Sequence, residues 1–375
     1  MLLWRLTGTQ NIFFHEGEAW MKHSSAIRAG LQWNLPIEQF VTLSHKLFSL
    51  IGTGGRVFWD SYMSRFTADA IGIALLGFDF EALDKPNGSF VQHYQEVVRD
   101  LSDPLYVSFP ILGRYLPRTR LLSRLMDLRN CFQAILDLKR QRRGSDFTSY
   151  MLDRPGMSDT ELLDNMVAVF MAGHGTTAGA LSSIVYYLAK HPYFQDRART
   201  EVLSVLHAKG HPTIADIDRM PFVYACIKES MRLNGPSINI NPRISATPLS
   251  VGPYTIPPNT PIVLNLYAVL HDEQAWPDAE RFNPDRFMFG QLDDLAGWLP
   301  FGTGPRRCPA SNFALYEQRT LVALLLREYE WSLPADSIHA DRPVNAFSSF
   351  ALNMPKDMYI DFKKNELADK KDHVL

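Results

Sequence analysis

The stretch that decides the fold is Phe301–Ala310, FGTGPRRCPA, a loop of glycines and arginines that carries a single cysteine. A long apolar run, ALYEQRTLVALLLREY, follows and predicts a buried helix. Pro309 suits the first turn of that helix, because its missing N–H would have no partner there. The pattern therefore predicts Cys308 at a helix N-terminus, where the helix dipole, Arg306 and Arg307 would lower the pKa of the thiol.

Several chemical roles are open to a thiolate on such a loop: nucleophile, zinc ligand or haem ligand. Zinc needs further ligands, and the three cysteines, Cys131, Cys226 and Cys308, are widely spaced without a CxxC pair. A nucleophile needs a histidine base, and none lies nearby in the sequence. A phosphate-binding loop is a weak alternative, because no GK[ST] follows the glycines. For one cysteine taken alone, an inert buried residue is the simplest interpretation.

The composition is that of a globular protein and excludes several classes of function. Of the 375 residues, 46% are apolar and 21% charged, and the formal net charge is -2. This balance gives no electrostatic reason to expect a nucleic acid partner. The cysteine usage favours a reducing compartment over a disulfide framework. No segment approaches the roughly 18 apolar residues that a membrane-spanning helix needs, and the start lacks the layout of a secretory signal.

Helical patterns dominate the first two-thirds of the chain. Ser158 and Glu161 form a capping-box pattern, which opens a long helix that is apolar on nearly every face and ends near Lys190. A further helix is predicted over Pro221–Leu233. The following stretch, Ser245–Val269, carries prolines and β-branched alternation that predict short strands and turns. We therefore expect a mostly α fold with a small β-rich part.

Three further groups of residues bear on the cysteine loop. Glu229 and Arg232 lie three apart on one predicted helix face and can form a charge-assisted pair. An aromatic-proline turn, Phe282–Phe287, carries Arg286. The long helix contains Ala172–Thr177, AGHGTT, whose two glycines cost ~1 kcal/mol each relative to alanine. We expect such glycines in a buried helix only where something lies against its backbone or where it bends.

In this order, these groups resemble the haem-thiolate monooxygenases of the cytochrome P450 family from about Glu16 to the C-terminal tail. Glu229 and Arg232 are similar to the ExxR pair of that family, and Arg286 is similar to the arginine that completes its triad, a structural unit below the haem. The segment Ala172–Thr177 resembles the oxygen-binding part of its central helix. The cysteine loop looks like the family's haem-ligand signature, with matches at Phe301, Gly302, Gly304, Arg306 and Cys308.

The resemblance implies heme b (iron protoporphyrin IX) as the cofactor, with Cys308 as axial ligand of the iron. A thiolate ligand pushes electron density onto the iron and favours O–O cleavage. Thr176 is the implied catalytic residue, because its hydroxyl would stand beside bound O2 and guide a proton. The alternative for Thr176 is a hydroxyl that bonds back to a carbonyl one turn earlier. The other residues implied to bind the haem are Trp20, Ala172, Phe301, and Arg243 and Arg306 at its propionates.

Four departures from the family pattern carry expectations. Gly175 stands where the family usually has an acidic residue, so we expect impaired or differently routed proton delivery. Ser24 replaces a basic residue, with His23 as a partial substitute, and Ala310 replaces a glycine. The fourth concerns the N-terminal anchor, first strands and first helices of eukaryotic-type relatives. We expect a single P450 domain over residues 1–375 that lacks those segments, as a fragment or a short form.

The implied reaction inserts one oxygen atom of O2 into a lipophilic small molecule, and the overall texture resembles fungal members of secondary metabolism. Electrons would come from an NADPH-cytochrome P450 reductase-type donor, because no flavin or nicotinamide motif is present. Val169–Ala172, Ser237–Ile240 and Phe347–Phe350 would line the pocket. Phe109–Leu122 mixes apolar and basic residues and predicts either contact with a membrane surface or a packed loop.

Other outcomes stay open at this point. The resemblance implies association with the endoplasmic reticulum membrane, whereas the lack of an anchor segment in this sequence favours the cytoplasm. One alternative function is a non-catalytic or poorly haem-loaded product of the same scaffold, which Gly175 favours. Another is a haem-thiolate isomerase or dehydratase, which needs no oxygen relay and against which Thr176 argues.

Overall fold

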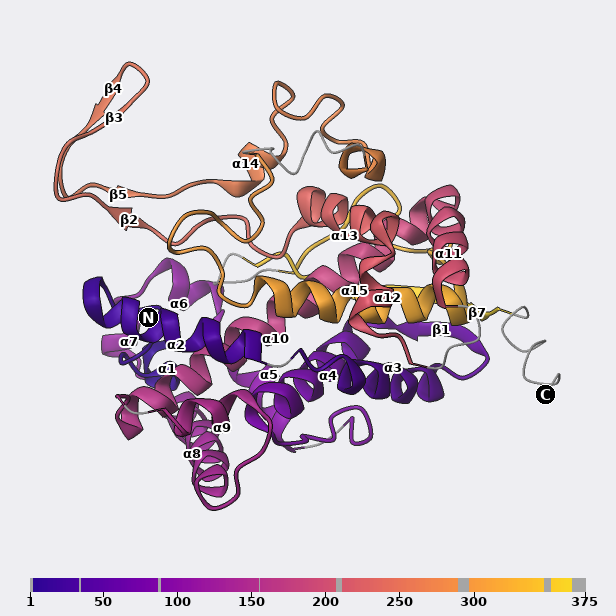
Figure 1. Ribbon diagram of the computed structural model, residues 1–375. Helices are drawn as coiled ribbons and strands as arrows, with labels where there is room; N and C mark the ends of the chain where they lie inside the picture. Colours follow the sequence, from indigo (N-terminus) through magenta and orange to yellow (C-terminus); the bar gives the residue numbers. More distant parts are fainter. Residues whose placement is uncertain are drawn as a thin grey trace.

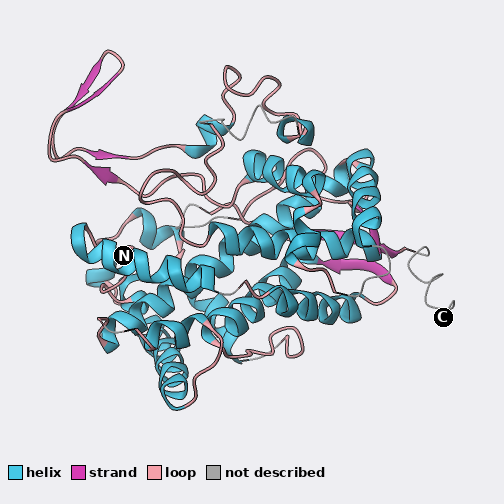
Figure 2. Ribbon diagram, in the orientation of Figure 1, coloured by secondary structure: helices cyan, strands magenta, loops and turns pink. Residues whose placement is uncertain are grey.

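The computed structural model describes residues 3–33, 35–86, 89–154, 156–206, 211–288, 297–346 and 352–365 (Figure 1). Within these ranges the chain is mostly helical with three small sheets, as the sequence predicts (Figure 2). The longer helices are α2 (Gly17–Trp33), α3 (Ile37–Ile51), α4 (Trp59–Ile71), α5 (Ser89–Leu101), α8 (Thr119–Gln141), α10 (Asp159–Lys190), α11 (Pro192–Leu206), α13 (Pro221–Asn234) and α15 (Ser311–Glu328). Shorter ones are α1 (Leu3–Thr7), α6 (Pro104–Ser108), α7 (Leu112–Tyr115), α9 (Phe147–Leu152), α12 (Ile214–Asp218), α14 (Leu266–Leu270) and two single-turn helices, Gly72–Leu76 and Pro284–Phe287.

Helix α10 is the central element of the helical body (Figure 1). It begins with the predicted capping box: Ser158 Oγ accepts from the Glu161 N–H, and the Glu161 carboxylate accepts from the Ser158 N–H. It ends at Lys190, before Pro192, and packs against α4, α13 and α15. Because its apolar residues point in nearly all directions, it can contact helices on several sides at once.

The three-stranded sheet closes one end of the body. Its order is β1 (Gly54–Phe58), β7 (Tyr359–Lys364), β6 (Tyr329–Ser332), with antiparallel pairing throughout. Val57 pairs with Ile360, and Trp331 pairs with Phe362. All four side chains are buried, so one face of this sheet belongs to the core.

The remaining strands form an arm that projects from the body (Figure 1). Strand β2 (Arg243–Ile244) pairs with β5 (Pro261–Ile262), and β3 (Leu249–Val251) pairs with β4 (Tyr254–Ile256). These are the short strands predicted for Ser245–Val269. The prediction is wrong at the end of that stretch, where α14 forms because Asn265 Oδ1 caps the helix by accepting from the Ala268 N–H.

A membrane-spanning segment was not expected from the sequence. Among the residues that the structure describes, no helix combines the length and the apolar character needed to cross a bilayer.

Candidate active site

A cavity of about 2380 Å³ lies against α10, α2 and the cysteine loop. Ligand sites in proteins usually measure ~300–1,000 Å³, so this cavity has room for a large prosthetic group together with a substrate. The structure brings together on its wall all seven residues that the sequence places near a haem: Trp20, Ala172, Thr176, Arg243, Phe301, Arg306 and Cys308. The predicted pocket segments also contribute, through Val169, Met171, Ser237, Asn239 and Ile240, whereas Phe347–Phe350 lie outside the described residues.

The cysteine loop has the backbone that its glycines predict. Gly302 and Gly304 both have φ +70°, a left-handed conformation that a side chain would strain. The Cys308 N–H donates to the Phe301 carbonyl at 2.9 Å and closes the loop. The sulfur of Cys308 is thereby presented at the cavity from a turn that only glycine accommodates well.

Two details of the cysteine prediction are wrong. Helix α15 begins at Ser311 rather than Pro309, so Cys308 lies in the turn before the helix. Burial of the thiol raises the pKa of Cys308, and the opposing effects of the Ala310 N–H, Arg28 and Arg307 do not reverse this. The protein alone therefore does not hold a free thiolate, and a bound cation would have to supply the stabilising charge.

Two arginines on the cavity wall bond to backbone carbonyls. Arg306 donates from Nη1 and Nη2 to the His15 carbonyl, both at 3.1 Å, and stacks on the Trp20 ring with 4.1 Å to its centroid. Arg243 donates to two carbonyls beside it, those of Asn241 and Pro242. Burial and then the charge of Arg243 lower the pKa of Arg306, which means that the two cations repel one another.

This arrangement tests whether a haem fits the site. Within the described residues, neither Arg243 nor Arg306 forms an ion pair with the protein. Two neighbouring cations on a cavity wall suit a ligand that carries two carboxylates, as the two propionates of a haem do. The residues present therefore fit the group that the cysteine loop implies.

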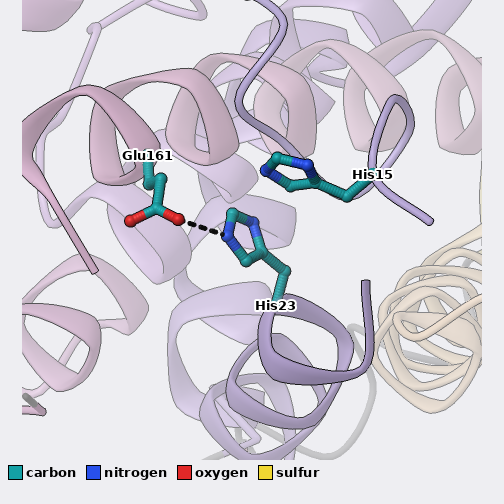
Figure 3. Close-up of side chains that lie close together, drawn as sticks. All are labelled: His15, His23 and Glu161. Carbon is teal, nitrogen blue, oxygen red and sulfur yellow. Dashed lines mark hydrogen bonds and ion pairs between the residues drawn. The ribbon is translucent and has the colours of Figure 1, made fainter. Parts of the chain in front are cut away.

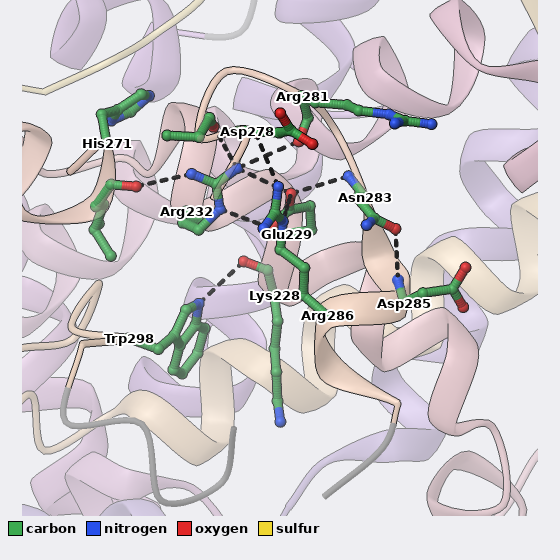
Figure 4. A network of polar contacts seen from close by, with 12 residues as sticks. Lys228, Glu229, Arg232, His271, Asp278, Arg281, Asn283, Asp285, Arg286 and Trp298 are labelled. Carbon is green, nitrogen blue, oxygen red and sulfur yellow. Dashed lines mark hydrogen bonds and ion pairs between the residues drawn. The ribbon is translucent and has the colours of Figure 1, made fainter. Parts of the chain in front are cut away.

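Glu229 and Arg232 form the predicted pair in the interior of the protein (Figure 4). Arg232 donates from Nε to Glu229 Oε2 at 2.7 Å and from Nη2 to Oε1 at 2.9 Å, a bidentate contact between side chains that are 0% exposed. Its remaining donors reach the carbonyls of Leu270 at 2.8 Å and Ala279 at 2.6 Å. Every side of the guanidinium thus has an oxygen partner.

Arg286 completes this group, as predicted (Figure 4). Its Nε lies 3.4 Å from Glu229 Oε1, an ion pair without hydrogen-bond geometry, and its Nη2 donates to the Asp278 carbonyl at 2.9 Å. The Asn283 N–H donates to the same Glu229 oxygen at 2.9 Å. The network therefore ties α13 to the loop that carries Phe282–Phe287.

The α10 segment Ala172–Thr177 is continuous helix. Thr176 Oγ1 donates to the Ala172 carbonyl at 2.7 Å, which is the bond back to the preceding turn. Gly173 fits the prediction of a close neighbour, because a Cβ there would lie 2.8 Å from Ile71 Cδ1. Gly175 does not, since its Cβ would meet Leu352 Cδ1 at 3.6 Å, an ordinary contact.

His174 does not replace the missing acid beside Thr176. Its Nε2 lies 2.9 Å from the Ser64 carbonyl and 3.2 Å from Ser64 Oγ, and its ring stacks on Phe170. Burial lowers the pKa of His174 to about 4, so this side chain is neutral near pH 7. It joins α10 to α4, as a packing residue would.

His23 does not take the place of the basic residue missing at Ser24. The buried His23 ring contacts Glu161 and Asn165 and is not among the cavity-lining residues. Instead, Arg28, one helical turn beyond Ser24, reaches the cysteine loop. Sequence reasoning missed Arg28: its i,i+4 spacing predicts the contact with Ser24, but nothing in the sequence predicts its contact with the loop.

His15, His23 and Glu161 lie close enough to suggest a metal site (Figure 3). The hydrogen bonds around His23 favour another interpretation. The Ile12 N–H donates to Asn165 Oδ1 at 3.0 Å, which fixes the amide so that Asn165 Nδ2 donates to His23 Nδ1 at 2.9 Å. The His23 proton therefore sits on Nε2 and is donated to Glu161 Oε1 at 3.0 Å, which leaves no lone pair there for a metal.

The fold and the site together define a haem-thiolate type of protein: a mostly α body, a cysteine on a glycine loop, and a cavity with two cationic side chains on its wall. The sequence model of the family described as "Cytochrome P450" matches residues 4–360. The chain belongs to the cytochrome P450 family. It is accordingly an oxidoreductase of the monooxygenase class, with a haem held by a cysteine thiolate.

Individual relatives agree with this assignment. The chain is 26% identical to rat (Rattus norvegicus) cytochrome P450 4F5 over 370 residues, which cover 88% of this chain and 70% of the relative. It is 32% identical to "Cytochrome P450 monooxygenase sphH" of Aspergillus fumigatus, covering 73% of this chain and 56% of that protein. A crystal structure of a cytochrome P450DA mutant heme domain superposes with a TM-score of 0.86 at 21% identity, covering 97% of this chain and 82% of that one, which shows the fold.

Proposed function

We propose that this protein inserts one oxygen atom of O2 into a lipophilic small molecule, with Cys308 as the ligand of the haem iron. The observation that carries the proposal is the position of Cys308 on the wall of a cavity that also presents Arg243 and Arg306. When bound, the haem supplies activation of O2, which no side chain can perform.

The side chains of the cavity have distinct parts in this proposal. Cys308 offers its sulfur from a loop that its own N–H closes on Phe301. Arg243 and Arg306 bind the propionates, and the stacking of Arg306 on Trp20 holds the guanidinium in place. Ala172 lines the cavity from α10, where its small side chain leaves room for a flat ring.

Thr176 is the proposed residue for moving a proton into the cavity. Its hydroxyl proton is donated to the Ala172 carbonyl, so its oxygen is free to accept a hydrogen bond from a water molecule. Rotation of the hydroxyl would release that proton toward the cavity. Gly175 has no carboxyl group to replace the proton that Thr176 gives up, so proton delivery relies on water or on a group from another part of the protein.

The substrate is proposed to be lipophilic because the described wall of the cavity is largely apolar. Val169, Met171, Ile240, Leu352 and Met354 contribute to it. Asn239 and Ser237 add a few polar groups that could orient a hydroxyl or carbonyl. A role in secondary metabolism of a fungal type is part of this proposal; the similarity to the Aspergillus fumigatus monooxygenase supports only its fungal character.

An electron donor of the NADPH-dependent reductase type is proposed, because membership of the cytochrome P450 family implies one. Contact with the endoplasmic reticulum membrane is proposed through Phe109–Leu122 and α6. Of the two alternatives for Phe109–Leu122, a packed loop does not describe α7, which buries none of its residues, whereas Leu121 at the start of α8 is buried. The most exposed apolar side chains there are Phe109 (58%), Ile111 (59%), Tyr115 (71%) and Leu116 (59%).

A haem-thiolate isomerase or dehydratase is the second candidate. The bond from Thr176 to Ala172 and the lack of a carboxylate at Gly175 favour it, because such reactions need no proton relay to oxygen. Incorporation of label from ¹⁸O2 into the product separates the two: a monooxygenase incorporates one labelled atom, and an isomerase or dehydratase incorporates none.

The ligand itself is tested by the ferrous–CO spectrum of purified, haem-loaded protein reduced chemically. We expect the red-shifted thiolate Soret band in the wild type and its complete loss in Cys308→Ser. The control is Cys131→Ser, since Cys131 is exposed and lies on α8, outside the cavity-lining set. An unchanged spectrum in Cys308→Ser would refute the proposal.

A further inference from the structure

We infer that Arg28 is a positioning residue that clamps the cysteine loop from α2 and favours the reduced state of the iron bound by Cys308. This inference rests on the proposed function, since it takes Cys308 as the iron ligand. It concerns a side chain that the loop signature does not include.

Three hydrogen bonds fix the Arg28 guanidinium. Its Nη2 donates to the Pro305 carbonyl at 2.7 Å and to the Arg307 carbonyl at 2.9 Å. Its Nε donates to Ser24 Oγ at 3.2 Å. Ser24 is buried and lines the cavity one turn earlier in α2. It therefore holds the Nε side of the Arg28 guanidinium, while Nη2 on the other side binds the loop.

The two carbonyls belong to the part of the loop that aims the sulfur. The Arg307 carbonyl is in the same peptide group as the Cys308 N–H, and that N–H donates to the Phe301 carbonyl at 2.9 Å. Arg28 therefore holds one side of this planar group while Phe301 holds the other. Rotation of the peptide, which would swing the Cys308 side chain, must break a bond on each side.

The charge of Arg28 acts on the same sulfur. The Arg28 guanidinium is 2.9 Å from the carbonyl of Arg307, the residue directly before Cys308, so its positive charge is held next to the ligand residue. Reduction of the iron adds one negative charge to the thiolate-bound centre. A cation held nearby favours the reduced state, so removing it should move the midpoint potential to more negative values.

Two substitutions separate the clamp from the charge. Arg28→Gln removes the charge and the forked donors. Arg28→Lys keeps the charge but offers a compact ammonium that cannot hold the same three oxygens in the geometry of a guanidinium. The control is Arg56→Gln on β1, an arginine that is also hydrogen-bonded, to Asp336 and Asp361, but lies outside the cavity wall.

The measurements are made on haem-loaded protein. One is the rate at which the ferrous–CO form loses its thiolate band on mild heating, and the other is the midpoint potential from a dye-mediated titration. Because hydrogen bonds from a charged group are stronger than neutral ones, we expect Arg28→Gln to speed the loss of the band about tenfold or more. Its midpoint should also be more negative than that of the wild type. Arg28→Lys should speed the loss of the band with little change in midpoint, and Arg56→Gln should change neither.

The inference fails if Arg28→Gln matches the wild type in both measurements. If that variant does not fold, Arg28→Lys and Ser24→Ala decide: band loss at the wild-type rate in both would overturn the clamp. A wild type without a thiolate band would instead count against the proposed role of Cys308.

Discussion

Two groups of arginines in this protein differ in how their charge is satisfied. Arg232, which is 1% exposed, has every direction occupied by oxygens of the protein, including both carboxylate oxygens of Glu229. Arg243 and Arg306 lie on the cavity wall, where the described hydrogen bonds of their guanidinium groups go to backbone carbonyls. A buried charge without full compensation is very costly, so the first group must be complete before any ligand arrives.

The difference indicates what each group is for. Glu229 is paired with both Arg232 and Arg286 within the protein. These ion pairs therefore contribute to the free energy of folding without any ligand. Arg243 and Arg306 repel one another within the protein, so an anionic ligand gains from both. The first group should therefore act on stability and the second on haem affinity.

The largest expected effect comes from breaking the buried group. Arg232→Ala removes both charge-assisted hydrogen bonds from the buried Glu229 carboxylate. Among its described contacts, this carboxylate then keeps only the longer ion pair with Arg286 and the hydrogen bond from the Asn283 N–H. Breaking a buried pair by removing one partner typically costs ~3–5 kcal/mol. We expect loss of most folded protein, measured by the urea midpoint of circular dichroism and by soluble yield. The control is Arg281→Ala on the adjacent loop, because the Arg281 side chain is exposed and extends away from the network (Figure 4). A stability within ~0.5 kcal/mol of the wild type would show that the pair is not essential.

An intermediate effect is expected from the cavity arginines. Arg243→Gln and Arg306→Gln should each weaken haem binding about tenfold, since each removes one charge-assisted contact worth ~1.5–3 kcal/mol. The double variant should lose about a hundredfold if the two contacts are independent. Haem transfer to an acceptor protein measures this, and the urea midpoint of the haem-free form should hardly move.

Arg99→Gln is the matched control for the cavity arginines. Arg99 also lines the cavity, but its side chain is 77% exposed, and no part in haem binding is predicted for it. If the double variant keeps its haem as tightly as this control, the contrast between the two arginine groups is wrong. If it unfolds without haem, the cavity arginines stabilise the fold after all.

The same contrast shows how far the sequence could predict this site. Glu229, Arg232 and the glycines of the cysteine loop were predictable because their spacing within one helix or one turn already determines the local geometry. The role of Arg28 was not predictable, because its partners are backbone carbonyls about 280 residues away. Every residue has a backbone carbonyl, so the sequence does not indicate which ones accept a hydrogen bond. The pKa of Cys308 was mispredicted for a related reason: burial depends on the whole fold, whereas only the local charges were visible.

The smallest effect on stability is expected at Gly175, a cavity-lining position on α10 that carries no side chain. An added Cβ would meet Leu352 Cδ1 at 3.6 Å and Met354 Sδ at 3.8 Å, which are ordinary contact distances, so a Cβ fits there. Replacing an interior helical glycine recovers a few tenths of a kcal/mol of helix propensity, which offsets part of the cost of placing a carboxyl group at this buried position. Gly175→Asp should therefore lose no more than ~1 kcal/mol of stability.

The functional consequence of Gly175→Asp should exceed its structural one. A carboxylic acid at position 175 can replace the proton that the Thr176 hydroxyl passes on, and then take up a new proton from water. Positioned acid–base groups contribute typically 10²–10⁴-fold. Because the wild type delivers protons by some other route, we expect a smaller gain, about twofold, in the fraction of NADPH that ends in product. Gly175→Asn is the control, since it has nearly the same shape without the acid. Equal coupling in the Asp and Asn variants would mean that protons reach this cavity without help from the α10 side, and that the missing acid is no handicap.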